Sequence, residues 1–220
     1  MQGIKRSSNR LIQVVAIFAL FVSFTSVSAA AEENNDSRWL ATVKGGIFEP
    51  DFDQYETFYG SDHTSYYGVS FSYLFRQHFE VGVGLDYSRS KGKGWLPQNQ
   101  QTGGEVRYSI MPVHAYVGYR GKFSAAQGVV PYVSLGLTYL RYEQKVLGQD
   151  DVDGGAGGFH WRAGVQFRLN SFDRAGAGKL SARYGIENTY LSLEYQSVSA
   201  KSDDIELGGQ SMLIGLVLEI

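Results

Sequence analysis

The sequence predicts an all-β protein in which eight antiparallel strands close into a transmembrane β-barrel, preceded by a cleaved signal peptide. Three observations lead to this fold class. Segments with a two-residue hydrophobic alternation recur along the chain, and that period fits a strand but not a helix. Aromatic residues begin and end several of the apolar rows. Glycine, tyrosine and phenylalanine are abundant, at 27, 15 and 13 residues, whereas proline is scarce, at 4.

The beginning of the chain resembles an export signal. An apolar stretch at 11–24 follows a basic start and precedes a run of small residues. The basic residues are Lys5, Arg6 and Arg10. We therefore expect residues 1–30 to be the signal peptide and residues 31–220 to form one barrel domain. The short apolar core argues against the alternative, an uncleaved membrane anchor, and no other run of 18 apolar residues follows it.

The bulk composition excludes several classes of function. The chain carries 20 basic and 22 acidic residues, so nothing in its charge favours nucleic acid as a partner. It has no cysteine, which excludes disulfides, thiol chemistry and acylation of a lipoprotein cysteine. Together with an export signal, this composition indicates the envelope of a Gram-negative bacterium.

The clearest pair of predicted strands lies between Tyr66 and Tyr87. Alternate positions from Tyr67 to Phe75 form one apolar row, and alternate positions from Phe79 to Tyr87 form a second. The polar residues 76–78 between them fit a hairpin turn. Each row has aromatic ends eight residues apart, which corresponds to about 20 Å along the axis of a tilted barrel. This height approximates the apolar band of an outer-membrane barrel, so the pair predicts a wall that faces lipid.

Six further segments alternate in the same way. The eight-residue aromatic spacing recurs in one of them, between Phe159 and Phe167. The six segments are 39–48, 105–120, 131–142, 159–168, 188–198 and 210–220. With the hairpin, they bring the predicted number of strands to eight.

The segment 105–120 changes its hydrophobic parity. Its apolar residues up to Ile110 occupy even positions, and those from Val113 onward occupy odd positions. A one-residue β-bulge at Met111-Pro112 would explain both the switch and the proline, which cannot donate a ladder hydrogen bond.

An even number of strands places both termini at one end of the barrel. With the termini in the periplasm, four longer loops lie outside the cell and three turns lie inside. The predicted loops are 49–64, 89–104, 143–158 and 200–208, and the turns are 76–78, 121–130 and 170–187. The last turn is irregular. It is either a turn with a short excursion, or Leu180–Tyr184 extends the next strand.

The chain resembles the small eight-stranded outer-membrane β-barrels, the group that includes OmpA, OmpX and OmpW. The resemblance covers about residues 38–220 and rests on the export signal, the eight alternating segments and the terminal apolar strand SMLIGLVLEI. Members usually end in an aromatic residue, and Ile220 departs from that pattern. The resemblance implies a porin-like protein, integral to the bacterial outer membrane. Its implied partners are outer-membrane lipid, lipopolysaccharide and the barrel-assembly machinery, and we expect a monomer.

Alternation alone does not decide which face meets lipid, because a soluble lipocalin-type barrel also alternates. The aromatic spacing favours the membrane barrel, and so do charges of both signs on the opposite rows, which suit a narrow interior where they pair. The predicted polar network of the lumen consists of Lys44, Glu80, Asp86, Arg120, Arg162, Arg168, Glu194 and Glu219.

Eight strands leave an interior just wide enough for side chains. The sequence therefore predicts a packed lumen and a structural or surface-interaction role carried by the extracellular loops. The alternative is a narrow channel for small or apolar solutes, as in OmpW-like members. Aromatic residues of the first loop would then form an apolar mouth, although packing against the barrel rim is the favoured interpretation. These residues are Phe52, Tyr55, Phe58 and Tyr59.

Some small barrels modify lipid A, so we considered an enzyme as well. The chain has four histidines, of which His114 and His160 face inward by parity, and none lies in the His-x-Ser-Asn pattern of deacylase barrels. The segment from Asp150 to Gly154 resembles half of a calcium loop but lacks the distal acidic ligand, which favours a solvated acidic loop. We therefore predict no catalytic residue, no metal and no cofactor.

Overall fold

The computed structural model of the protein describes residues 39–51, 55–75, 78–95, 102–124, 126–146, 151–202 and 205–220. The predicted signal peptide and Asp150 lie outside these residues.

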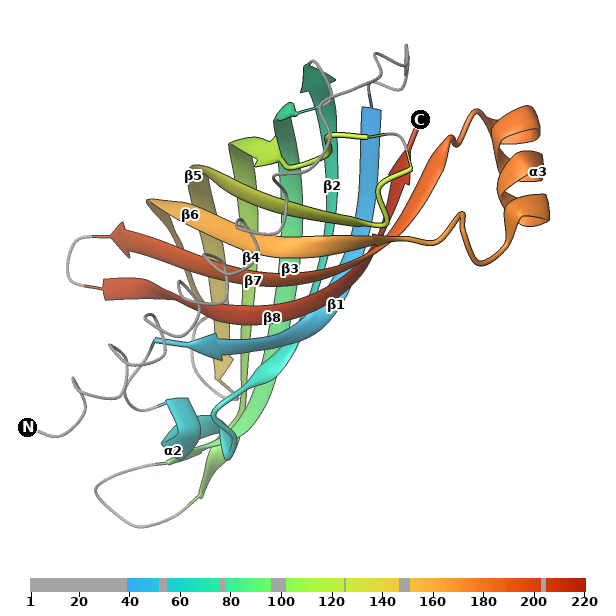
Figure 1. The fold of residues 1–220 in the computed structure, drawn as a ribbon. Helices are drawn as coiled ribbons and strands as arrows, with labels where there is room; N and C mark the ends of the chain where they lie inside the picture. The colour runs from blue at the N-terminus through green and yellow to red at the C-terminus, as the bar shows by residue number, and fades with distance from the viewer. Residues whose placement is uncertain are drawn as a thin grey trace, which may run out of the picture. The chain divides into compact units, whose positions relative to one another are not determined.

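Eight antiparallel strands form a closed barrel in the order β1 to β8, in which β1 also pairs with β8 (Figure 1). This confirms the predicted closed, all-β barrel. The strands are β1 Trp39–Pro50, β2 Thr64–Phe75, β3 Phe79–Trp95, β4 Thr102–Arg120, β5 Val129–Val146, β6 Val152–Arg168, β7 Asn188–Ser202 and β8 Ile205–Glu219. We call the end that carries the β1–β2, β3–β4, β5–β6 and β7–β8 connections the loop end, and the opposite end the terminal end.

The two faces of the wall differ as the alternation predicts. The apolar rows point outward and are exposed, as Phe71, Val83, Leu137 and Ile214 show. The opposite rows point into the barrel and are buried, including charged residues such as Lys44. The predicted facing of the other strands is confirmed in the same way, with one exception in β4.

The predicted β-bulge at Met111-Pro112 is wrong. β4 pairs with β5 in one continuous register from Val106 to Arg120, and its register with β3 shifts only between Lys93 and Trp95. Val106, Tyr108 and Ile110 are inward-facing members of a regular strand. The parity switch therefore marks a change in the barrel interior, which is polar at mid-height and apolar toward the loop end.

Several strands continue into segments that were predicted to be loops. β3 and β4 occupy most of 89–104, and β5 and β6 occupy most of 143–158. Beyond the aromatic rows the outward positions become polar, as Arg89 and Lys145 show, so the apolar alternation ends while the hydrogen-bonded ladder continues. The strands β3 to β6 are 17 to 19 residues long.

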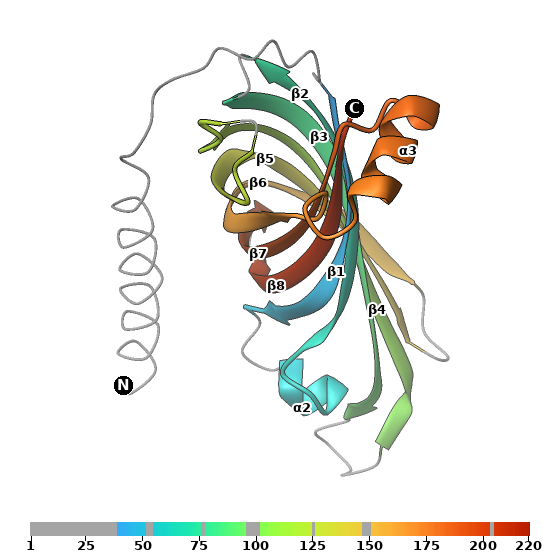
Figure 2. The same cartoon turned by 45° about the vertical axis from the view of Figure 1, so that its right-hand side comes forward.

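Two helices lie at opposite ends of the barrel, α2 (Tyr55–Tyr59) at the loop end and α3 (Arg174–Tyr184) at the terminal end (Figure 2). The alternative in which Leu180–Tyr184 extends a strand is therefore wrong. Asp173 caps α3 by accepting from the backbone N–H of Gly176, and Gly185 ends it with φ 69°. Neither of these helices is long and apolar enough to cross a membrane.

Candidate functional site

Lys44 stands at the centre of a buried network inside the barrel. Its ammonium Nζ lies 2.9 Å from Glu194 Oε1, 2.7 Å from Gln196 Oε1 and 3.6 Å from Asp86 Oδ2. All four side chains are buried. One cation from β1 thus neutralises carboxylates from β3 and β7, which joins distant parts of the wall across the lumen.

Asp86 extends this network toward the opposite wall. Its Oδ2 accepts from the Tyr66 hydroxyl at 3.0 Å and lies 2.9 Å from His114 Nε2. Thr138 Oγ1 lies between two imidazoles, 2.8 Å from His114 Nδ1 and 2.9 Å from His160 Nδ1. With both rings neutral, each of these contacts has one donor and one acceptor, while the remaining ring nitrogen of His160, Nε2, is buried without a hydrogen-bond partner among the described residues.

Arg162 forms the second half of the central network. Its Nε donates to Ser134 Oγ at 2.6 Å, and its two terminal nitrogens lie 3.9 Å from carboxylate oxygens of Glu80 and Glu194. The guanidinium carbon also lies 3.7 Å from the centroid of the Tyr116 ring. Arg162 therefore spans the lumen and is held by two charges and an aromatic face.

A separate network fills the terminal end. Glu219 accepts from Lys122 Nζ at 2.7 Å and from the Tyr190 hydroxyl at 2.8 Å, and Arg120 Nη1 lies 3.8 Å away. Arg120 Nη2 also donates to Gln166 Oε1 at 2.7 Å. Because Glu219 belongs to the last strand, this network ties β8 to the interior.

The structure places the eight residues of the predicted lumen network in two groups rather than one. Five of them belong to the central network, namely Lys44, Glu80, Asp86, Arg162 and Glu194. Arg120 and Glu219 belong to the terminal network. Arg168, at the end of β6, is half-buried, and its charge acts on Lys122 and Tyr190 of the terminal network. Lys122 was missed because it follows the predicted strand, although it shares the parity of Arg120.

Apolar layers lie beyond the polar networks. One layer surrounds the loop end of the lumen and the other lies toward the terminal end. The loop-end layer consists of Phe48, Tyr66, Ile110, Leu140, Ala156, Ala200 and Leu213, and the other consists of Leu40, Leu74, Val130, Tyr190 and Val217. A cavity of about 20 Å³ remains between the networks, which holds about one water molecule.

Aromatic side chains of α2 pack against β3 and β4 at the loop end. Tyr55 is buried and its hydroxyl contacts Ser90 Oγ. Tyr59 packs 4.6 Å from the Tyr55 ring and 6.2 Å from the Tyr108 ring, measured between ring centroids. Burial, followed by the proximity of Tyr55, raises the pKa of Tyr59 to about 12. For these two residues the structure agrees with rim packing, while Phe52 and the side chain of Phe58 lie outside the described part.

His114 contacts a hydroxyl, that of Thr138, through Nδ1 and a carboxylate, that of Asp86, through Nε2, but all three side chains are buried inside the barrel. His114 and His160 face inward, as predicted, and are buried. Ser61 Oγ and Asp62 Oδ1 both contact the same atom of His63, its Nδ1, at 3.4 Å and 2.5 Å. A catalytic triad needs both ring nitrogens, one for the nucleophile and one for the acid.

The acidic segment before β6 pairs with basic residues of β5. Lys145 Nζ lies 2.9 Å from Asp151 Oδ2, and Arg141 Nη2 lies 3.8 Å from Asp153 Oδ2. Among the described residues no group of three or more His, Cys, Asp or Glu is arranged to hold a metal ion. The described part of the segment that resembles half of a calcium loop thus forms exposed ion pairs with β5. Asp150 lies outside the described residues.

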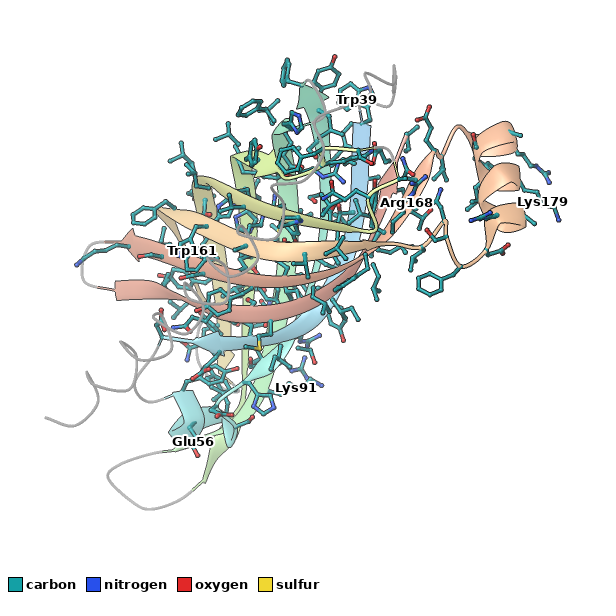
Figure 3. The ribbon with its side chains drawn as sticks, in the orientation of Figure 1. Trp39, Glu56, Lys91, Trp161, Arg168 and Lys179 are labelled. Carbon is teal, nitrogen blue, oxygen red and sulfur yellow. The ribbon has the colours of Figure 1, made fainter. Side chains whose placement is uncertain are left out.

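The outer wall carries a shallow apolar groove across β1 to β6. Its volume is about 870 Å³, and it is lined by outward side chains such as Phe71, Val83 and Leu137. Trp39 and Trp161, labelled in Figure 3, also line it. The lining is almost entirely apolar, which suits hydrocarbon rather than a polar ligand.

The sequence matches the family model described as outer membrane protein beta-barrel domain over residues 17–218. No curated relative matches the chain by sequence. The match covers the whole described barrel up to Leu218 and agrees with the family resemblance of the alternating segments.

Several solved structures are similar to this chain, and the first of them shares its fold. Neisserial surface protein A is 14% identical, with a TM-score of 0.55, and the alignment covers 83% of this chain and 97% of that one. OprG from Pseudomonas aeruginosa is 12% identical, with a TM-score of 0.48, over 84% and 98% of the two chains. Ail, the attachment invasion locus protein of Yersinia pestis, is 14% identical, with a TM-score of 0.46, over 82% and 98%.

Proposed function

The chain belongs to the outer membrane protein beta-barrel domain family and is an integral protein of the Gram-negative outer membrane, and we propose that it acts there as a closed, non-enzymatic barrel. In this proposal the barrel is a scaffold, and its loop end faces the cell exterior and carries the interactions. The lumen carries no solute.

The observation that supports a closed barrel is the filling of the lumen. Lys44 and Arg162 reach acidic partners on other strands, and apolar layers lie above and below them. Moving an ion through this interior would require separating buried ion pairs, and leaving one buried charge without its partner costs about 3–5 kcal/mol.

The length of the strands supports a role for the loop end. β3 to β6 continue well past the aromatic rows, and they carry charged outward residues there, such as Arg89 and Lys145. The turn between β2 and β3 at the terminal end is short by comparison. A rigid ribbon that rises above the bilayer presents side chains at a fixed height, which suits binding to a surface partner.

Conductance in planar bilayers tests the closed lumen. The purified full chain is expected to give no reproducible single-channel steps over a range of voltages. A double variant, Arg162→Ala with Glu194→Ala, removes the side chains that cross the lumen and is expected to conduct if it folds. Reproducible single-channel conductance steps from the unaltered protein, of the size expected for a narrow channel, would overturn the closed-barrel proposal.

A narrow conduit for apolar solutes is the second candidate, and one observation favours it. The loop-end layer of the interior is apolar, and Tyr55 and Tyr59 pack beside Tyr108 at its edge. An apolar solute would enter if those rings moved aside. Uptake of an apolar fluorophore into protein-containing vesicles, compared with protein-free vesicles, tests this function, and equal rates in the two would reject it.

A lipid A-modifying activity remains the least supported function. The inward histidines are buried and bonded within the wall, and His63 lacks the triad geometry. Lipid A mass profiles from cells with and without the protein are expected to be identical. A mass difference of an acyl or phosphate group would show an enzymatic role.

A further inference from the structure

Two buried histidines share one hydroxyl inside the barrel. The rings of His114 on β4 and His160 on β6 have centroids 4.3 Å apart, and Thr138 Oγ1 on β5 contacts the Nδ1 atom of both. The second ring nitrogen of His114 contacts Asp86, whereas Nε2 of His160 is buried without a hydrogen-bond partner among the described residues. The chain of contacts therefore ends in a carboxylate on one side and in a single ring nitrogen on the other.

Asp86 is held as an ionised carboxylate. Its Oδ2 accepts from the Tyr66 hydroxyl at 3.0 Å and from the Gln196 amide at 3.1 Å. The ammonium of Lys44 lies 3.6 Å from the same oxygen. All of these groups favour a carboxylate that carries no proton, and such a carboxylate can only accept hydrogen bonds.

The ionised Asp86 fixes the direction of every hydrogen bond in the chain. Because Asp86 accepts, Nε2 of His114 carries a hydrogen, and in the neutral ring Nδ1 is then an acceptor. Thr138 donates its hydroxyl hydrogen to that Nδ1 and accepts from Nδ1–H of His160. Nε2 of His160 is therefore a bare, basic nitrogen.

A proton from solvent that binds this bare nitrogen can be passed on without movement of any heavy atom. As Nε2 of His160 gains the proton, its Nδ1 proton moves to Thr138 Oγ1, and the hydroxyl passes its own hydrogen to Nδ1 of His114. One proton enters, and one positive charge appears on His114. His160 is again neutral, with its hydrogen now on Nε2.

The surroundings favour the charge on His114 over the charge on His160. Nε2 of His114 lies 2.9 Å from Asp86, while among the described residues no carboxylate pairs with His160. The next inward residue of β6 is a cation, Arg162, and its guanidinium lies against the Tyr116 ring, which is 6.3 Å from the His160 ring. A charge on His160 would thus meet a like charge without a carboxylate contact.

The charge count of the central network also accommodates one proton. Seven strands contribute charged or titratable groups around the pair: Lys44 on β1, Tyr66 on β2, Glu80 and Asp86 on β3, Tyr116 on β4, Tyr132 on β5, Arg162 on β6 and Glu194 on β7. The inward acidic residue that the structure describes on β8, Glu219, belongs to the terminal network. Three carboxylates thus face two fixed cations, and a proton on His114 brings the sum to zero. A second proton would place two imidazolium rings side by side.

We propose that His114, Thr138 and His160 form a proton relay that binds one proton, holds its charge on His114 and reverses the hydrogen-bond direction at His160. The relay makes the interior of the barrel sensitive to pH while the wall stays closed. It goes beyond the proposed function, because it needs the buried pair but neither the orientation of the barrel nor any role of its loops.

The ¹⁵N NMR signals of the imidazole rings test the relay. The folded full chain, labelled at histidine, is titrated from about pH 9 to about pH 4 in the background His63→Gln with His78→Gln, which removes the other histidines. At the alkaline end the two rings should be opposite tautomers, with hydrogen on Nε2 of His114 and on Nδ1 of His160. On acidification His114 should become doubly protonated, and His160 should move its hydrogen to Nε2 with the same midpoint. His160→Gln assigns the signals.

Thr138 offers a matched pair of variants. Thr138→Val keeps the shape of the side chain but lacks the hydroxyl, so the hydrogen on His160 should no longer follow the charge on His114. Thr138→Ser retains the hydroxyl and should show the coupled change. Heat-modifiable migration in gels shows whether each variant is folded.

Three results in the background protein would overturn the relay: a second imidazolium at His160, a His160 tautomer that stays constant while His114 titrates, or no change at either ring. Coupling that persists in folded Thr138→Val would overturn the role of the hydroxyl. The conductance test of the closed lumen is separate from these measurements, so a failure of one proposal is distinguishable from a failure of the other.

Discussion

At the scale of single residues, the stability of the barrel interior depends on a few buried charges with several partners each. Lys44 contacts Glu194 and Gln196, which lie 150 and 152 positions away in the sequence. The sequence predicts that Lys44 points inward, because strand alternation fixes the face of each residue. It does not predict the partners, since these depend on the stagger of the strands and on which rows meet across the closed lumen.

Replacing Lys44 with methionine should destabilise the barrel strongly. The methionine keeps most of the volume but leaves Glu194 and Asp86 buried without their shared cation, which costs about 3–5 kcal/mol. Urea unfolding in lipid vesicles would measure this loss. Adding Glu194→Gln to Lys44→Met should recover part of it. Lys179→Met on the exposed helix α3 is the control and should change the unfolding free energy by less than about 0.5 kcal/mol.

Two adjacent glycines of β6 should respond oppositely to alanine. A Cβ at Gly158 would meet Ser199 O at 2.0 Å and the Cα of Ala200 at 2.5 Å, both in the neighbouring backbone. A Cβ at Gly157 would have nothing within 4 Å. Gly158→Ala should therefore cost at least about 1–3 kcal/mol, and Gly157→Ala should be neutral or slightly stabilising. Equal effects in the same urea assay would contradict the close approach of β6 and β7.

At the scale of elements, the sequence predicted the strands and their faces but not their ends. The parity switch in β4 predicts a bulge only if one face of the strand is apolar along its whole length. In the barrel, Ile110 is apolar and inward because the interior itself becomes apolar there. The helix α3 was missed for a related reason. None of its residues is buried, so it lacks the apolar stripe that reveals most helices.

Removing α3 should leave the barrel intact. The excursion is closed at its base, where Asn170 Nδ2 donates to Glu187 O and the backbone N–H of Thr189 donates to Asn170 Oδ1. Replacing residues 171–186 with Asn-Gly should change the unfolding free energy by less than about 1 kcal/mol, since no buried apolar side chain of the helix is lost. Failure of this variant to fold would show that α3 supports the wall.

At the scale of the whole molecule, barrel closure follows from the number of strands and the common apolar face, both of which the sequence contains. The pairing of β1 with β8 cannot be read from any local pattern in the sequence, because most of the chain separates the two strands. The cross-strand neighbours beyond the aromatic rows also could not be predicted. The sequence places Lys91 in a loop and Arg107 in a strand, and only the continued β3–β4 ladder brings them opposite each other.

The closed barrel should migrate differently in gels before and after boiling. Its hydrogen-bonded wall resists detergent at room temperature, so the unboiled protein should run as a compact species. Heating should shift it to the position of the unfolded chain, at about 24.4 kDa with the signal peptide and at a lower mass without it. A soluble barrel would show no such shift in the membrane fraction. Lack of the shift for the protein extracted from outer membranes would contradict the lipid-facing wall.

The seam between the first and last strands determines when this protein can enter a membrane. Trp39 and Ile220 exchange backbone hydrogen bonds of 3.0 and 2.9 Å, so β1 obtains its second neighbour only from β8, the last of the eight strands. A partly synthesised chain would expose an open sheet edge, and hydrocarbon offers no partner for its backbone groups. All eight strands must therefore be present before the wall can close, and no partial set of them satisfies its backbone groups in hydrocarbon.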